Sequence, residues 1–163
     1  MYQHDIDNLN SEALVKKSAT QKSAVPKFCY AHFMLPHFPF YKDSTGNYIN
    51  IELAGSTASI NNKELFLSYL KYTNSVIRSL VDTIVLNDPQ AVVVVMSDHG
   101  YRNYNNSGYE PFQFNNMCFL RLPDKNYPTY ADSWSAVNFF RYLFNGQFGQ
   151  QLPYLEDHTV TFP

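Results

Sequence analysis

The segment 91–97, AVVVVMS, constrains the fold of this chain more than any other feature of its sequence. Its residues are continuously apolar and mostly β-branched, and no polar residue interrupts them until Ser97. A strand with one face in water shows alternating polar residues, whereas a strand buried on both faces of a parallel sheet shows such an unbroken run. The segment therefore predicts an α/β fold with a parallel sheet.

A long amphipathic helix is predicted directly before this strand, over residues 62–86. Asn61, followed three residues later by Glu64, resembles the capping box at a helix N-terminus. Asn87 and Pro89 are residue types that end helices. A mostly apolar set of side chains recurs at steps of three and four residues, as along the buried face of a helix. Its members are Phe66, Leu70, Thr73, Ile77, Leu80 and Ile84.

A further strand is predicted over residues 28–34, because this aromatic segment lies between Pro26 and Pro36 and is largely apolar on both faces. With the helix and the strand 91–97 it would form a β-α-β unit, in which the two strands are parallel. Residues 1–26 are polar, with a short helix predicted around residues 11–17. We therefore expect a polar lead-in over 1–26 and one domain over 27–163.

The C-terminal part of the chain contains two more predicted elements. The segment 116–122, NMCFLRL, is a third strand candidate. Asp132 or Ser133 can cap a helix that runs through Asn145 and ends at Gly146.

The composition excludes several classes of function. Of the 163 residues, 45% are hydrophobic and 16% are charged, which favours a packed core over disorder. The net charge is −2 without a basic cluster, which argues against a nucleic-acid partner. No apolar run approaches the roughly 20 residues that span a bilayer, so a soluble domain is expected.

The two cysteines permit one disulfide but do not require it. The apolar neighbours of Cys29 and Cys118 favour buried free thiols.

The tetrapeptide Ser97-Asp98-His99-Gly100 ends the strand 91–97. Ligands of open α/β sheets bind beyond the carboxyl ends of the strands, so a site is expected at this position. Asp and His supply an oxygen and a nitrogen ligand, a mixed set that suits Zn²⁺ or Mn²⁺. The alternative is a turn in which Asp98 caps local amides and His99 is merely exposed.

Two histidines follow the predicted strand 28–34. His32 and His37 would lie at the same edge of the sheet as Asp98, and the prolines on either side of His37 restrict its backbone. An imidazole there could contact an anionic oxygen or act as a general acid. The alternatives are a core or edge histidine for His32 and an aromatic-loop residue for His37.

The ordered set of these segments resembles a known family, the sulfatase-like branch of the alkaline phosphatase superfamily. The resemblance rests on YAHFMLPHFPFYKDSTG (30–46), the helix 68–85, VVVVMSDHGYR (92–102) and the ending 135–157. Within that branch the chain is most similar to the C-terminal portion of membrane-anchored phosphoglycerol transferases and lipoteichoic-acid synthases. The resemblance implies that the α/β fold is part of a doubly wound sheet with flanking helices.

The resemblance implies roles for individual residues. Asp98 and His99 would ligate a catalytic divalent metal, Mn²⁺ or Zn²⁺ first, with Mg²⁺ or Ca²⁺ as alternatives. His37 would contact the oxygens of a phosphate or sulfate ester, and His32 and Arg102 are further candidate contacts. The metal would stabilise the developing oxyanion and activate the nucleophile.

The resemblance also implies what to expect outside this chain. The family's nucleophile and a further acidic metal ligand belong to its N-terminal half, so no catalytic nucleophile is expected here, and Cys29 lacks the nucleophile's context. We therefore expect a partner N-terminal half of the same protein, a membrane anchor upstream, an extracytoplasmic location and no turnover by the isolated chain. A homodimer could satisfy an open sheet edge. The rival interpretation is a non-catalytic binding or envelope scaffold module of the same fold.

Overall fold

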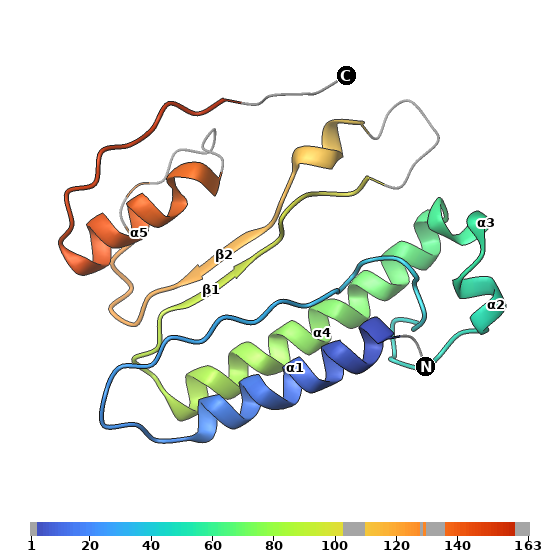
Figure 1. Cartoon of the computed structure of the whole chain (residues 1–163), viewed down its shortest axis with the longest axis horizontal. Helices are drawn as coiled ribbons and strands as arrows, with labels where there is room; N and C mark the ends of the chain where they lie inside the picture. Colours follow the sequence, from blue (N-terminus) through green and yellow to red (C-terminus); the bar gives the residue numbers. More distant parts are fainter. Residues whose placement is uncertain (1–2, 103–109, 128, 130–135, 159–163) are drawn as a thin grey trace. The chain divides into compact units, whose positions relative to one another are not determined.

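The computed structural model describes residues 3–102, 110–127, 129 and 136–158 (Figure 1). The chain divides into two compact units, Met1–Pro123 and Asp124–Pro163. Within the described residues, none of the helices combines the length and apolarity needed to cross a membrane.

Two long helices pack side by side in the first unit (Figure 1). They are α1 (Gln3–Thr20) and α4 (Lys63–Asn87). Helix α4 confirms the predicted helix 62–86, and it buries Tyr69, Thr73, Val76 and Leu80 along one face. Helix α1 extends the short helix predicted around residues 11–17 to eighteen residues.

The N-cap of α4 differs by one residue from the prediction. The side chain of Asn62 accepts a hydrogen bond from Leu65 N at 3.0 Å, which satisfies an N–H group that the first turn leaves open. Asn61 instead ends the short helix α3 (Thr57–Ile60), where its backbone N–H donates to Ser59 O.

The segment between α1 and α4 supplies much of the core. Phe40 and Tyr41 are buried against Tyr69 of α4 and against Ala54, the last residue of the short helix α2 (Ile51–Ala54). Their rings meet Tyr69 in tilted and edge-to-face contacts, with centroids 6.2 and 5.1 Å apart.

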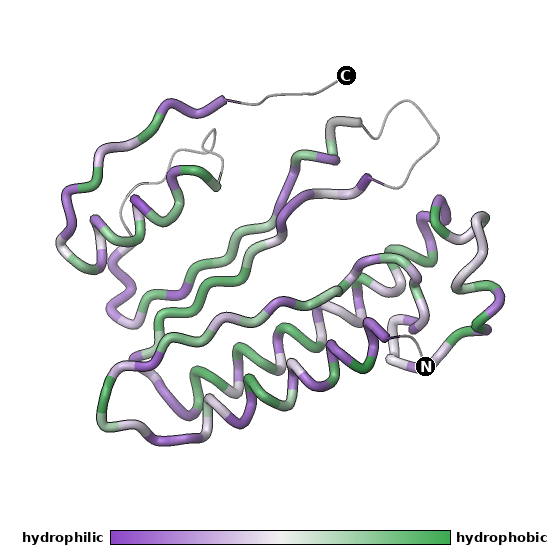
Figure 2. The backbone as a smooth tube through the Cα atoms, in the orientation of Figure 1, coloured by the Kyte–Doolittle hydropathy of each residue, from purple (hydrophilic) through white to green (hydrophobic). Residues whose placement is uncertain are grey.

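The sheet consists of β1 (Val93–Met96) and β2 (Cys118–Arg121), which pair antiparallel with Val93 opposite Arg121. Figure 2 shows that both strands are mostly hydrophobic. The 3₁₀ helix η1 (Glu110–Phe114) precedes β2. These strands confirm the elements predicted within 91–97 and 116–122, and the helices with this small sheet agree with an α/β fold.

The predicted β-α-β unit was wrong in its pairing. Residues 28–34 are extended but form no strand, and Phe28 and Tyr30 are 93% and 78% exposed. In the described part of the chain β1 pairs only with β2. Two antiparallel strands can be joined by a loop, whereas two parallel strands require a crossover connection.

The prediction for the two cysteines was right about their oxidation state and wrong about their burial. Cys29 and Cys118 are both free, as favoured, but they are exposed.

The second unit is organised by α5 (Phe139–Phe148), which follows the 3₁₀ helix η2 (Ala136–Asn138). Helix α5 continues past Gly146 and ends at Gly149, whose φ of 62° lies in the left-handed region that glycine favours. The side chain of Asn138 donates to Leu155 O and accepts from Leu155 N, both at 2.9 Å, and so holds the C-terminal segment. The predicted caps Asp132 and Ser133 lie outside the described residues.

Candidate functional site

Asp98 and His99 lie directly after β1, as predicted, and their side chains face each other. His99 Nε2 is 3.7 Å from Asp98 Oδ2. The Asp98 side chain is 84% exposed and the His99 side chain 31% exposed, so the pair can be reached from solvent.

The backbone around this pair is fixed by hydrogen bonds to the segment before β2. Ser97 N donates to Met117 O at 3.0 Å, and Met117 N donates to Ser97 Oγ at 2.7 Å. Gly100 N donates to Gln113 O at 2.9 Å. A Cβ atom at Gly100 would lie 1.8 Å from Phe112 O, so only glycine permits this close approach of the two backbones.

The ring of His99 is oriented by its own loop. Its Nδ1 atom is 2.6 Å from Gly100 O. A carbonyl oxygen only accepts, so Nδ1 carries the proton and Nε2 of the neutral ring keeps its lone pair, beside the Asp98 carboxylate. Metal-binding histidines are commonly oriented by this kind of hydrogen bond to a backbone carbonyl.

This donor set can supply two ligands to a divalent ion. Two ligands about 2.1 Å from a tetrahedral ion would be about 3.4 Å apart, close to the observed 3.7 Å. In the described part of the chain no group of three His, Cys, Asp or Glu side chains could hold a metal ion together. The residues present therefore fit a metal as two of its ligands.

His37 is exposed and belongs to a different neighbourhood. Its backbone N–H donates to Met34 O at 3.2 Å, and its Nδ1 contacts Phe38 O. Its ring lies edge-on to the ring of His4 in α1, with centroids 6.0 Å apart. Among the described residues no hydrogen bond or ion pair joins His37 to Asp98 or His99, so the predicted meeting of these residues stays a prediction.

The two other candidate contacts are exposed. His32 lines a cavity of about 330 Å³ between the extended segment and α1, together with residues such as Tyr30 and Leu14. Its exposure is not that of a core histidine. Arg102 is exposed at the end of the described loop. Their roles toward a substrate stay predictions.

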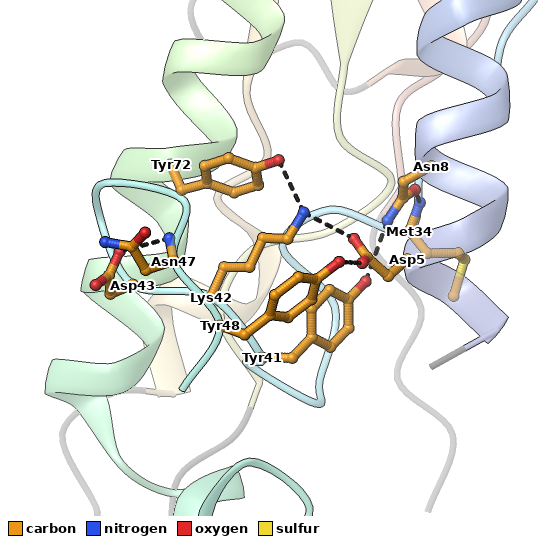
Figure 3. Close-up of polar contacts among 9 residues, drawn as sticks. All are labelled: Asp5, Asn8, Met34, Tyr41, Lys42, Asp43, Asn47, Tyr48 and Tyr72. Carbon is orange, nitrogen blue, oxygen red and sulfur yellow. Dashed lines mark hydrogen bonds and ion pairs between the residues drawn. The ribbon is translucent and has the colours of Figure 1, made fainter. Parts of the chain in front are cut away.

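A buried polar cluster between α1 and α4 was not predicted from the sequence (Figure 3). Lys42 Nζ is 3.0 Å from Asp5 Oδ1 and donates to Tyr72 OH at 3.2 Å, and Tyr48 OH donates to Asp5. The side chains of Asp5 and Lys42 are only 3% and 6% exposed. The one signal in the sequence was Lys42, a lysine that directly follows the aromatic residues Phe40 and Tyr41. The burial of Asp5 and Asn8 on α1 appears only in the structure.

The electrostatics of the cluster follow from these contacts. Burial on its own would lower the pKa of Lys42, but the hydrogen bonds to Asp5 and Tyr72 outweigh it, and the pKa is raised above its usual value. The hydrogen bond to Asp5 also raises the pKa of Tyr48. Through the ion pair of Asp5 and Lys42, the cluster joins α1 to the segment that follows His37.

Comparisons with known proteins give one match. A family model described as Sulfatase matches residues 2–142, which is most of the chain. No curated protein and no solved structure matches the chain. The matched range includes α1, the segment with His37 and the Asp98-His99 pair. This chain therefore belongs to the sulfatase family, within the alkaline phosphatase superfamily.

Proposed function

We propose that the chain is the C-terminal part of a metal-dependent enzyme that hydrolyses or transfers a phosphate or sulfate ester. The observation that carries the proposal is the convergence of Asp98 Oδ2 and His99 Nε2 after β1. Enzymes of the sulfatase family generally use a divalent metal. Asp98 and His99 would be two of its ligands, with Mn²⁺ or Zn²⁺ preferred and Mg²⁺ or Ca²⁺ as alternatives.

The residues of this chain would act mainly by binding and orientation. A bound divalent ion supplies charge stabilisation at an ester oxygen. The Gly100 carbonyl keeps the His99 ring in the tautomer that can serve as a ligand. His37, when protonated, can donate from Nε2 to an anionic oxygen of the transferred group, and His32 and Arg102 are further candidate contacts.

The finer proposal concerns the rest of the protein. A structural or catalytic metal usually has three or more protein ligands, and only two converge among the described residues. We infer that a nucleophile and the remaining ligands come from an N-terminal half. The sequence resemblance favours a phosphoglycerol-transferase-like enzyme, with an anchor upstream and an extracytoplasmic catalytic domain.

The size and location of the natural product test this proposal. An antibody raised against this chain is expected to detect a much larger protein in the membrane fraction. A soluble product of the same size as this chain would contradict the proposal, and it would favour a non-catalytic binding module instead.

Turnover provides a second test. The isolated chain is expected to release no product from nitrophenyl phosphate or nitrophenyl sulfate in the presence of Mn²⁺ or Zn²⁺. The larger protein is expected to turn over such an ester and to lose activity in Asp98→Ala, whereas Asp7→Ala, which changes an exposed carboxylate of α1, should retain it. Turnover by the isolated chain that Asp98→Ala abolishes would refute the inferred N-terminal half.

A further inference from the structure

His4 and His37 form a pair of imidazoles that the sequence did not reveal. His4 lies in the first turn of α1, and His37 lies between Pro36 and Pro39. Their ring centroids are 6.0 Å apart, with an angle of 64° between the ring planes. Neither His4 nor this pairing has a role in the function proposed above.

Buried contacts hold the two histidines in this arrangement. Asn8, one turn after His4, accepts a hydrogen bond from Met34 N at 2.7 Å and donates to Tyr41 OH at 3.3 Å. Asp5, the neighbour of His4, forms the buried ion pair with Lys42 (Figure 3). Helix α1 is therefore joined to the backbone both before and after His37. Ligands held in this way lose little freedom when they bind.

The hydrogen bond of the His37 ring determines which nitrogen is available. Nδ1 contacts Phe38 O, and a carbonyl oxygen cannot donate, so Nδ1 carries the proton. In the neutral ring Nε2 then has a free lone pair and cannot donate to an anion. A lone pair on Nε2, with Nδ1–H held by a backbone carbonyl, is the usual state of a histidine that binds a metal.

We propose that His4 and His37 together bind a divalent transition-metal ion through their ring nitrogens. An ion about 2.1 Å from a ring nitrogen lies about 3.2 Å from the ring centre, so two coordinated rings can have centres up to about 6.4 Å apart. The observed 6.0 Å lies within this limit. The two rings are therefore close enough to share one ion.

The chemistry of the pair selects the type of ion. Imidazole nitrogens suit Zn²⁺, Cu²⁺ and Ni²⁺, whereas Mg²⁺ and Ca²⁺ prefer oxygen ligands. No third His, Cys, Asp or Glu of the described residues completes the site, so the other positions are open to water or to an oxygen of an anionic ligand. With an ion at this position, a neutral His37 would help to bind an anion, because the anion would contact the metal that His37 holds.

Zinc titration of the chain tests the proposal. Isothermal titration calorimetry with Zn²⁺ alone should show a binding event that His4→Ala and His37→Ala each weaken by about tenfold or more. The double variant should lose little beyond the single ones, because one ion uses both rings. His32→Ala, which changes another exposed histidine, should leave the event unchanged. His4→Cys should restore affinity, since a thiolate is also a zinc ligand.

The experiment also separates this site from the Asp98-His99 pair. His99→Ala should leave Zn²⁺ binding at His4 and His37 intact. Either of the two proposed metal sites can therefore be refuted without the other. Imidazole NMR signals of the unaltered chain provide a readout that does not depend on the variants folding, and those of His4 and His37 should shift together with Zn²⁺. The proposal is overturned if these signals do not move, or if His4→Ala binds Zn²⁺ as tightly as the unaltered chain.

Discussion

Replacing Asp5 by Asn tests whether the buried ion pair joins α1 to the rest of the first unit. The change keeps the shape of the side chain and removes the charge that faces Lys42 Nζ at 3.0 Å. Lys42 would keep its hydrogen bond to Tyr72 OH but lose its buried counter-charge, with its side chain only 6% exposed. Breaking a buried pair in this way typically costs about 3–5 kcal/mol.

We expect about 3 kcal/mol for Asp5→Asn, the lower end of that range, because the Asn oxygen can still accept a hydrogen bond. Small domains have about 5–15 kcal/mol of stability in total, so the midpoint of urea denaturation, followed by circular dichroism, should fall clearly. Asp7→Asn, in the same helix but exposed, should change stability by less than about 0.5 kcal/mol.

A double variant distinguishes the ion pair from a general effect on the helix. Asp5→Asn combined with Lys42→Met removes both charges, so the loss should be smaller than the sum of the two single losses by about 2 kcal/mol. Additive losses, or a loss of less than about 1 kcal/mol for Asp5→Asn alone, would refute the reasoning.

Three further predictions concern the same unit, and urea denaturation measures each of them. Leu80→Ala, at a position 4% exposed, should cost about 2–5 kcal/mol, whereas Leu86→Ala, 82% exposed, should cost less than about 0.5 kcal/mol; equal losses would contradict the described packing of α4. Asn62→Ala should cost about 1 kcal/mol by removing the cap on Leu65 N, and a larger loss for Asn61→Ala would favour the original sequence prediction. The raised pKa of Lys42 means that its stabilisation is fully present below its usual value of 10.5 and is lost as the pH rises through the folded value. Lys42→Met should therefore lose less stability between pH 9 and pH 12 than the unaltered chain, and identical losses would count against the pair.

The elements that were predicted correctly are those with a strong local pattern. Helix α4 has a regular apolar face, and β1 lies in an unbroken β-branched run. Helix α1 has no such face, because the residues it buries are Asp5 and Asn8. Hydrophobic periodicity therefore could not predict its full length.

The errors arose where structure depends on distant partners. Residues 28–34 have the composition of a strand, but a strand needs a neighbour to accept and donate its backbone hydrogen bonds. Among the predicted strands, the described part of the chain supplies such a neighbour only to β1 and β2, which pair with each other. Composition alone could not show which predicted strands would pair.

The same distinction applies to the candidate site. Asp98, His99 and Gly100 are adjacent in sequence, so their proximity could be predicted, although the close approach of Gly100 to Phe112 could not. The contact of His4 with His37 depends on how α1 packs. No local pattern in the sequence marks it.

The most direct test of the account is where Mn²⁺ binds on this chain. Paramagnetic Mn²⁺ broadens NMR signals of nearby nuclei, so even weak binding can be located residue by residue. We predict selective broadening of the backbone amides of Asp98, His99 and Gly100, which Asp98→Asn abolishes and Asp7→Asn leaves unchanged. No broadening of these three amides, or broadening of them that persists in Asp98→Asn, would contradict the proposal that Asp98 and His99 are metal ligands.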